Sequence, residues 1–150
     1  GQGVSITPMR LIAAISAIAN GGVLMEPQIV AGKAPQKVRQ VVSPQTAEAV
    51  TGMMVSAVRK AEIGQVSSYT VAGKTGTAQV SVPGGYSSDQ FIHSFVGFVP
   101  ASHPRVTILI KLDKPQAAVA GMTVVPAFRE FAQFILNYYG VPPDALENSH

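Results

Sequence analysis

Ala72-Gly73-Lys74-Thr75-Gly76-Thr77-Ala78 is the stretch on which the interpretation of this 150-residue chain depends. It places one cation, two hydroxyls and two glycines inside a run that favours a β-strand. Because side chains alternate along a strand, Thr75 and Thr77 are expected on one face, with Lys74 and Gly76 on the other. Two neighbouring hydroxyls can bind a carboxylate, and a glycine without a Cβ lets another backbone approach closely. The stretch is therefore a candidate site for an anionic ligand.

Two phosphate-binding motifs do not fit the chain. Gly73-Lys74-Thr75 matches the end of a P-loop, but Ser68 stands where that motif needs its first glycine. A P-loop also leads directly into a helix, and the residues from Gln79 to Pro83 are a poor helix start. Gly1-Gln2-Gly3 is only the first half of a dinucleotide-binding fingerprint, because Ile6 occupies the place of its last glycine.

A second interpretation of the stretch is the K-T-G element, which occurs with S-x-x-K and S-D-N in penicillin-binding proteins and class A β-lactamases. This element suits an edge strand, whose unpaired N–H groups can pair with an extended peptide and point at a developing oxyanion. A tripeptide alone carries little weight, because a surface lysine beside a strand threonine is common. The flanking sequence must therefore distinguish a K-T-G element from an ordinary strand.

From this stretch onward the pattern predicts a sheet and a closing helix. Pro- and Gly-containing turns separate three β-rich runs, which indicates an antiparallel meander: Val71–Val82, Phe91–Val99 and Arg105–Leu112. Apolar residues at helical spacing then run from Val125 to Tyr139, where Gly140 ends the helix.

Upstream of it the pattern predicts two helices. Thr7-Pro8 and Ser43-Pro44 are both N-cap and first-turn proline pairs, and the helices extend to about Ala19 and Lys60. The first is apolar around most of its circumference, so it is expected to be buried on most sides. Short extended segments are expected at 23–30 and 38–42. The fold class is α+β, with an antiparallel sheet packed against helices, and the predicted boundaries are a domain at 1–140 and a tail at 141–150.

Composition sets the class of protein. Hydrophobic residues make up 47%, charged residues 13%, and the mean hydropathy is +0.26, which excludes disorder and predicts that part of the surface is an interface. The net charge is +3, but the basic residues are scattered, so no nucleic-acid partner is expected. With no cysteine there is no disulfide, thiolate nucleophile or zinc-thiolate site. No membrane-spanning run or signal peptide is visible, and the chain is expected to begin inside a longer protein.

Three blocks in order resemble the class B penicillin-binding proteins, which are peptidoglycan D,D-transpeptidases. The blocks are Gly1-Gln2-Gly3 through Thr7-Pro8 to Asn20-Gly21-Gly22, then Ala72 to Ala78, then Ser94-Phe95-Val96-Gly97-Phe98-Val99-Pro100. The resemblance covers Gly1 to about Tyr139. It implies the fold shared by penicillin-binding transpeptidases and β-lactamases, of which this chain would be the C-terminal portion.

The resemblance also implies roles for single residues. Lys74 would be the K-T-G lysine, a catalytic residue that holds positive potential and hydrogen-bonds the serine of an S-x-N motif. Thr75, Gly76 and Thr77 would bind substrate, with the threonine hydroxyls on the carboxylate of the peptide or of a β-lactam. The N–H of Thr77 would complete the oxyanion hole, which makes Thr77 catalytic as well. No cofactor and no metal are implied.

The chain departs from the family pattern in one respect. It contains no S-x-N and no S-x-x-K, and in Ser56-Ala57-Val58-Arg59 an arginine stands where S-x-x-K has its lysine. Arginine cannot replace that lysine as a general base. In the family these motifs precede the block that opens this chain. The chain is therefore expected to carry the binding wall of the site without the nucleophile, and to be inactive alone.

The intact protein would cross-link peptidoglycan stem peptides through a serine acyl-enzyme and would be trapped by β-lactams. The resemblance implies an extracytoplasmic domain of a membrane-anchored protein that works with the cell-wall synthesis machinery of cell division or cell shape. Its other partner would be the missing N-terminal part of the same protein. Two alternatives stay open, a non-catalytic β-lactam-sensing receptor domain and a serine β-lactamase.

The remaining polar residues favour structural roles. His93 adjoins Ser94, but neighbours on a strand point to opposite faces, so His93 is expected to be structural or to face solvent. The three histidines are separated, which makes a metal site improbable. Three aspartates are expected in solvated loops: Asp89, Asp113 and Asp144. Aromatic residues of the last helix are expected to form packing surface: Phe128, Phe131, Phe134, Tyr138 and Tyr139.

Overall fold

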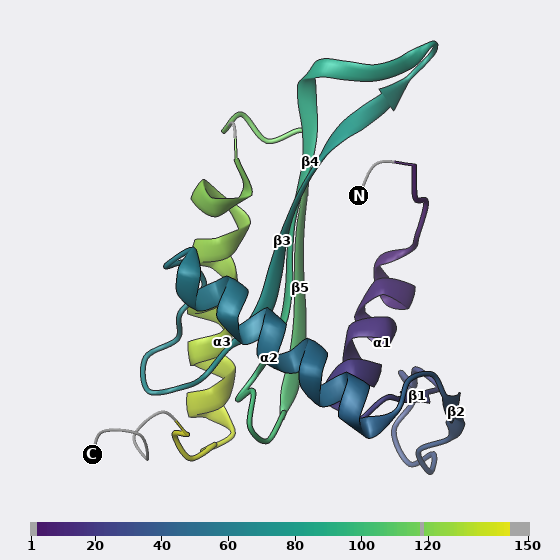
Figure 1. The fold of residues 1–150 in the computed structure, drawn as a ribbon, viewed down its shortest axis with the longest axis vertical. Coiled ribbons are helices and arrows are strands. Elements are labelled where there is room, and N and C mark those ends of the chain that lie inside the picture. Colours follow the sequence, from purple (N-terminus) through teal and green to yellow (C-terminus); the bar gives the residue numbers. More distant parts are fainter. Residues whose placement is uncertain (1–2, 118, 145–150) are drawn as a thin grey trace.

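The computed structural model describes residues 3–117 and 119–144 and confirms the α+β class. A three-stranded antiparallel sheet has the order β3-β4-β5, with bounds Ala72–Val82, Gly85–Val99 and Val106–Asp113. The helices are α1 (Pro8–Ala19), α2 (Pro44–Lys60) and α3 (Val124–Tyr138), and a 3-10 turn η1 (Ala120–Met122) precedes α3. A separate small sheet pairs β1 (Val23–Met25) with β2 (Lys37–Gln40). In Figure 1, α1 and α3 flank the sheet and α2 crosses in front of it.

The helix starts are those that the capping residues predict. The Thr7 hydroxyl accepts a hydrogen bond from Arg10 N at 3.3 Å, and the Ser43 hydroxyl accepts one from Thr46 N at 3.1 Å. The predicted burial of the first helix is wrong, because Ala17 is its one fully buried residue. It packs on the sheet along one side, with Ile15 among the contacts, and its other residues remain partly or fully exposed.

Apolar clusters lie on both faces of the sheet. On one face the rings of Phe95 and Phe128 lie 4.5 Å apart between β4 and α3, and Leu136 continues this core. On the other, Phe98 packs with Met54 of α2 and with α1. α2 contributes to both clusters because it crosses the sheet beside β3. The sheet is thereby covered at the end where β3 begins and β4 ends.

The β3–β4 hairpin is longer than the sequence predicts. β4 begins at Gly85 rather than at Phe91, and Gly84, with φ +87°, makes the turn. Asp89 therefore lies in a strand, contrary to prediction, and Asp113 ends β5. The reason is that the tip of the hairpin projects beyond the helices (Figure 1), so polar residues occupy both faces and no alternation marks the strand.

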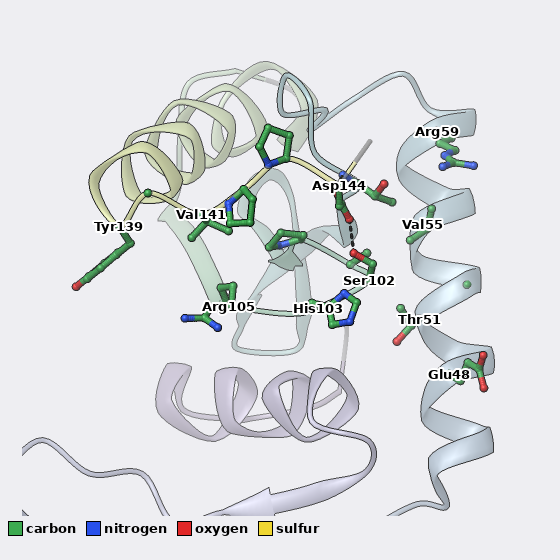
Figure 2. Close-up of a pocket in the computed structure, with 17 residues that line it drawn as sticks. Glu48, Thr51, Val55, Arg59, Ser102, His103, Arg105, Tyr139, Val141 and Asp144 are labelled. Carbon is green, nitrogen blue, oxygen red and sulfur yellow. Dashed lines mark hydrogen bonds between the residues drawn. The ribbon is translucent and has the colours of Figure 1, made fainter. Parts of the chain in front are cut away.

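The predicted tail begins with residues that contact the sheet end. Tyr69 donates a hydrogen bond to Val141 O at 2.5 Å. The Asp144 carboxylate accepts from Thr70 N and from the Ser102 hydroxyl, both at 2.6 Å, and Figure 2 shows the second bond. The prediction of a solvated Asp144 is therefore wrong, since both of its oxygens bind the protein. Residues 145–150 lie outside the described part.

The aromatic side chains of α3 divide between the core and the surface. On α3, Phe128 is buried as predicted, whereas Phe134 and Tyr138 stack at 6.1 Å and are 62% and 73% exposed. Within residues 3–117 and 119–144, no helix combines the length and the apolarity that crossing a membrane requires.

Candidate functional site

The K-T-G stretch lies on an edge strand. β3 pairs with β4 on one side only, and its first residues, Ala72 and Gly73, are buried where α2 packs against them. From Lys74 onward the strand emerges, and Lys74 and Thr77 are exposed. The Lys74 ammonium group donates to Thr75 O at 3.0 Å. The strand thus presents a cation at an edge that no other strand covers among the described residues.

The strand register fixes which side chains share a face. Thr75 pairs with Phe95 and Thr77 with His93, so both threonines lie on the face covered by α3. Gly76 pairs with Ser94 and lies on the opposite face with Lys74. The alternation has the form that the sequence predicts. A ligand along the edge would therefore meet the hydroxyls from one side and the ammonium group from the other.

Packing restricts the two glycines of the stretch to different degrees. A Cβ on Gly73 would lie 2.4 Å from Cζ of Phe95, a rigid ring in the core. A Cβ on Gly76 would lie 2.5 Å from the hydroxyl oxygen of Ser94. The sequence suggests that Gly76 leaves room for another backbone, but on this face the space beside it holds the Ser94 hydroxyl. Ser94 is half-buried and belongs to the site neighbourhood.

His93 is buried inside the protein, which confirms the structural role rather than the solvent-facing one of the two that the sequence predicts. Its side chain is 0% exposed, and Nδ1 lies 3.0 Å from Oγ1 of Thr123. Its Nε2 has no hydrogen-bond partner among the described residues. Sequence reasoning missed Thr123, because 30 residues separate it from His93 and only the packing of α3 brings them together.

A cavity of about 780 Å³ lies elsewhere, at the end of the sheet where β4 turns into β5. Figure 2 shows its walls, which are one side of α2, the turn around Ser102 and His103, and the segment from Tyr139 to Asp144. No residue from Lys74 to Thr77 lines it. Within the described residues, no three His, Asp or Glu side chains gather as a metal site would require.

Comparison with known proteins agrees with the fold. Residues 1–133 match the family model for the penicillin-binding protein transpeptidase domain. The chain belongs to this family.

Two relatives are the penicillin-binding protein PbpB of Mycolicibacterium smegmatis, 34% identical, and the stage V sporulation protein D of Bacillus subtilis, 33% identical. Each alignment covers 95% of this chain but only 26% and 25% of the relative, so the chain spans about a quarter of their length.

Solved structures give the same result for the fold. The transpeptidase domain of Burkholderia pseudomallei penicillin-binding protein 3 has a TM-score of 0.84 at 32% identity, over 96% of this chain and 46% of that one. Penicillin-binding protein 3 of Mycobacterium tuberculosis complexed with ampicillin has a TM-score of 0.79 at 30% identity, over 96% and 37%. The predicted transpeptidase fold is confirmed.

Proposed function

We propose that the intact protein is a serine D,D-transpeptidase that cross-links peptidoglycan stem peptides and is acylated by β-lactams. The observation that carries this is a K-T-G-T stretch, with Lys74 and Thr77 exposed, on the edge strand of a chain that matches the transpeptidase family over residues 1–133. Relatives of the chain are named as probable peptidoglycan D,D-transpeptidases, from Pseudomonas aeruginosa and from Neisseria species.

The proposed mechanism divides the work along β3. Thr75 and Thr77 hydrogen-bond the substrate carboxylate from the α3 face. Lys74 supplies positive potential from the opposite face and holds the serine of an S-x-N motif. The Thr77 N–H completes an oxyanion hole with the N–H of the nucleophile, which stabilises the tetrahedral intermediate. Alternate residues of an edge strand direct their N–H groups to the same side, so Thr75 and Thr77 share this direction.

The nucleophile and its lysine would come from a preceding segment of the same protein, because no S-x-x-K or S-x-N occurs in the 150 residues. The proposal places the domain outside the cytoplasm, on a protein anchored in the inner membrane and assembled with the cell-wall synthesis machinery. Support for this placement comes from the substrate, since peptidoglycan is an extracytoplasmic polymer.

Labelling with a fluorescent penicillin tests the proposal. The 150-residue chain alone should form no covalent adduct, whereas the chain extended with the protein's own upstream sequence should gain one adduct per molecule by intact-mass spectrometry. A β-lactam adduct on the isolated chain, or none on the extended protein, would contradict the proposal. Rapid hydrolysis of the adduct would instead favour a β-lactamase, and a stable adduct without cross-linking of a stem peptide would favour a receptor.

A further inference from the structure

The fully buried His93 lies immediately behind the exposed Thr77. The two residues are direct partners in the β3–β4 ladder, so their side chains project from the same face with Cβ atoms about 4.5–5.5 Å apart. Thr77 is on the edge strand and His93 on the middle strand, which explains why one is exposed and the other 0% exposed. Whatever holds the His93 ring therefore also forms the support of Thr77 on the α3 side.

The Thr123 hydroxyl holds that ring, and its second contact indicates which ring nitrogen carries the proton. Oγ1 of Thr123 lies 3.0 Å from Nδ1 of His93 and donates to Ala120 O at 3.4 Å. A hydroxyl has a single proton, so with that proton directed to Ala120 its oxygen accepts from Nδ1–H. His93 is then the Nδ1–H tautomer. Its Nε2 is a buried acceptor without a partner among the described residues.

A buried histidine at position 93 stabilises the fold less than an apolar side chain of similar size would. A buried acceptor without a partner lowers stability, and an apolar side chain of similar volume would fill the same space without that cost. What the imidazole provides instead is a bond from the sheet to the 120–123 turn, which packs against β3 and β4. The turn leads directly into α3.

We infer that His93 is a positioning residue: through its bond to Thr123 it fixes the 120–123 turn behind β3 and thereby holds Thr77 in place for the substrate carboxylate and the oxyanion. This inference rests on the role proposed for Thr77.

A double-mutant cycle in the extended, acylation-competent protein tests whether the bond acts through Thr77. Thr123→Val keeps the side-chain shape and deletes the hydroxyl, and it should slow acylation by benzylpenicillin about 3- to 10-fold, as expected for one lost hydrogen bond. Thr123→Ser keeps the hydroxyl and should stay within about 2-fold of the parent. In the Thr77→Val background, Thr123→Val should add less than about 2-fold, because residues that act as a unit are not additive.

Thr51→Val is the matched control, because Thr51 also donates a hydroxyl hydrogen bond, at 2.9 Å to Ala47 O, but within α2. It should not change the acylation rate. Equal effects of Thr123→Val in both backgrounds would overturn the inference, as would an unchanged rate in the parent background. A parent protein that binds no penicillin at all would instead refute the proposed function.

Two further measurements separate positioning from packing. Long-range nitrogen–proton NMR of the parent protein should show the His93 proton on Nδ1 and this nitrogen hydrogen-bonded, and an Nδ1 without a hydrogen bond would overturn the inference. His93→Leu removes the unpartnered acceptor, so the melting temperature should be unchanged or higher while acylation slows. A lower melting temperature with an unchanged acylation rate of the folded protein would assign His93 a packing role only.

Discussion

Gly76→Ala separates the packing role of Gly76 from its proposed role in binding. The added Cβ would lie 2.5 Å from the Ser94 hydroxyl oxygen but 3.9 Å from the Ser94 Cβ, so only the hydroxyl obstructs it. Turning that hydroxyl aside costs about 0.5–1.5 kcal/mol. The backbone φ of Gly76 is not positive, and replacing glycine by alanine at such a position stabilises by about 0.4–1 kcal/mol. The single change should therefore alter the free energy of unfolding by less than about 1 kcal/mol.

The Ser94→Ala background reveals the steric part, because it removes the obstructing atom. There Gly76→Ala should stabilise by about 0.4–1 kcal/mol, which gives a coupling of about 0.5–1.5 kcal/mol between the two positions. Urea unfolding of the parent, the two single variants and the double variant, each extended with the upstream sequence, measures this coupling. Additive effects would refute the steric reasoning. Acylation by penicillin should be slow in both Gly76→Ala proteins, with or without Ser94→Ala, because the methyl group lies beside the edge where substrate pairs. Full recovery would show that Gly76 matters only through Ser94.

Three other changes test the site, the core and the C-terminal segment. Thr77→Val in the extended protein should slow acylation about ten- to a hundredfold, since a charge-assisted hydrogen bond of about 1.5–3 kcal/mol is lost, and an unchanged rate would refute the assignment. Phe128→Ala removes the ring that packs at a tilt against Phe95 and should cost about 3–5 kcal/mol in urea unfolding. Asp144→Ala deletes two hydrogen bonds and should cost about 1–3 kcal/mol, while Asp89→Ala, at an exposed position, should cost less.

Features that depend on neighbouring residues were predictable from the sequence. The caps at Thr7 and Ser43 act over three residues, and the turns between the strands carry their own glycines and prolines. The strand alternation from Lys74 to Thr77 is equally local, so the faces of the K-T-G stretch followed directly. The hairpin tip did not, because a strand without a buried face leaves no hydrophobic pattern.

Contacts between distant parts of the chain could not be predicted in this way. The Asp144 carboxylate binds the backbone of Thr70, which is 74 residues away, and in the sequence it resembles any loop aspartate. The environments of Ser94 and His93 depend on the β3–β4 register, and a shift by one residue would exchange their faces. Sequence placed the two side chains on opposite faces of one strand but left open which of them meets the core.

The register also explains how one strand can present a hydroxyl group from one face and an ammonium group from the other to the same ligand. An extended peptide that pairs with the free edge of β3 would lie between the two faces of the sheet. Its backbone pairing is indifferent to side chains, because main-chain hydrogen bonds supply it. Discrimination must then come from groups that project beside the edge, which are the hydroxyl of Thr77 on one face and the ammonium group of Lys74 on the other. Exchanging the residues at these two positions would keep the composition of the site but reverse the faces, and the proposed contact of the Thr77 hydroxyl with the carboxylate would be lost.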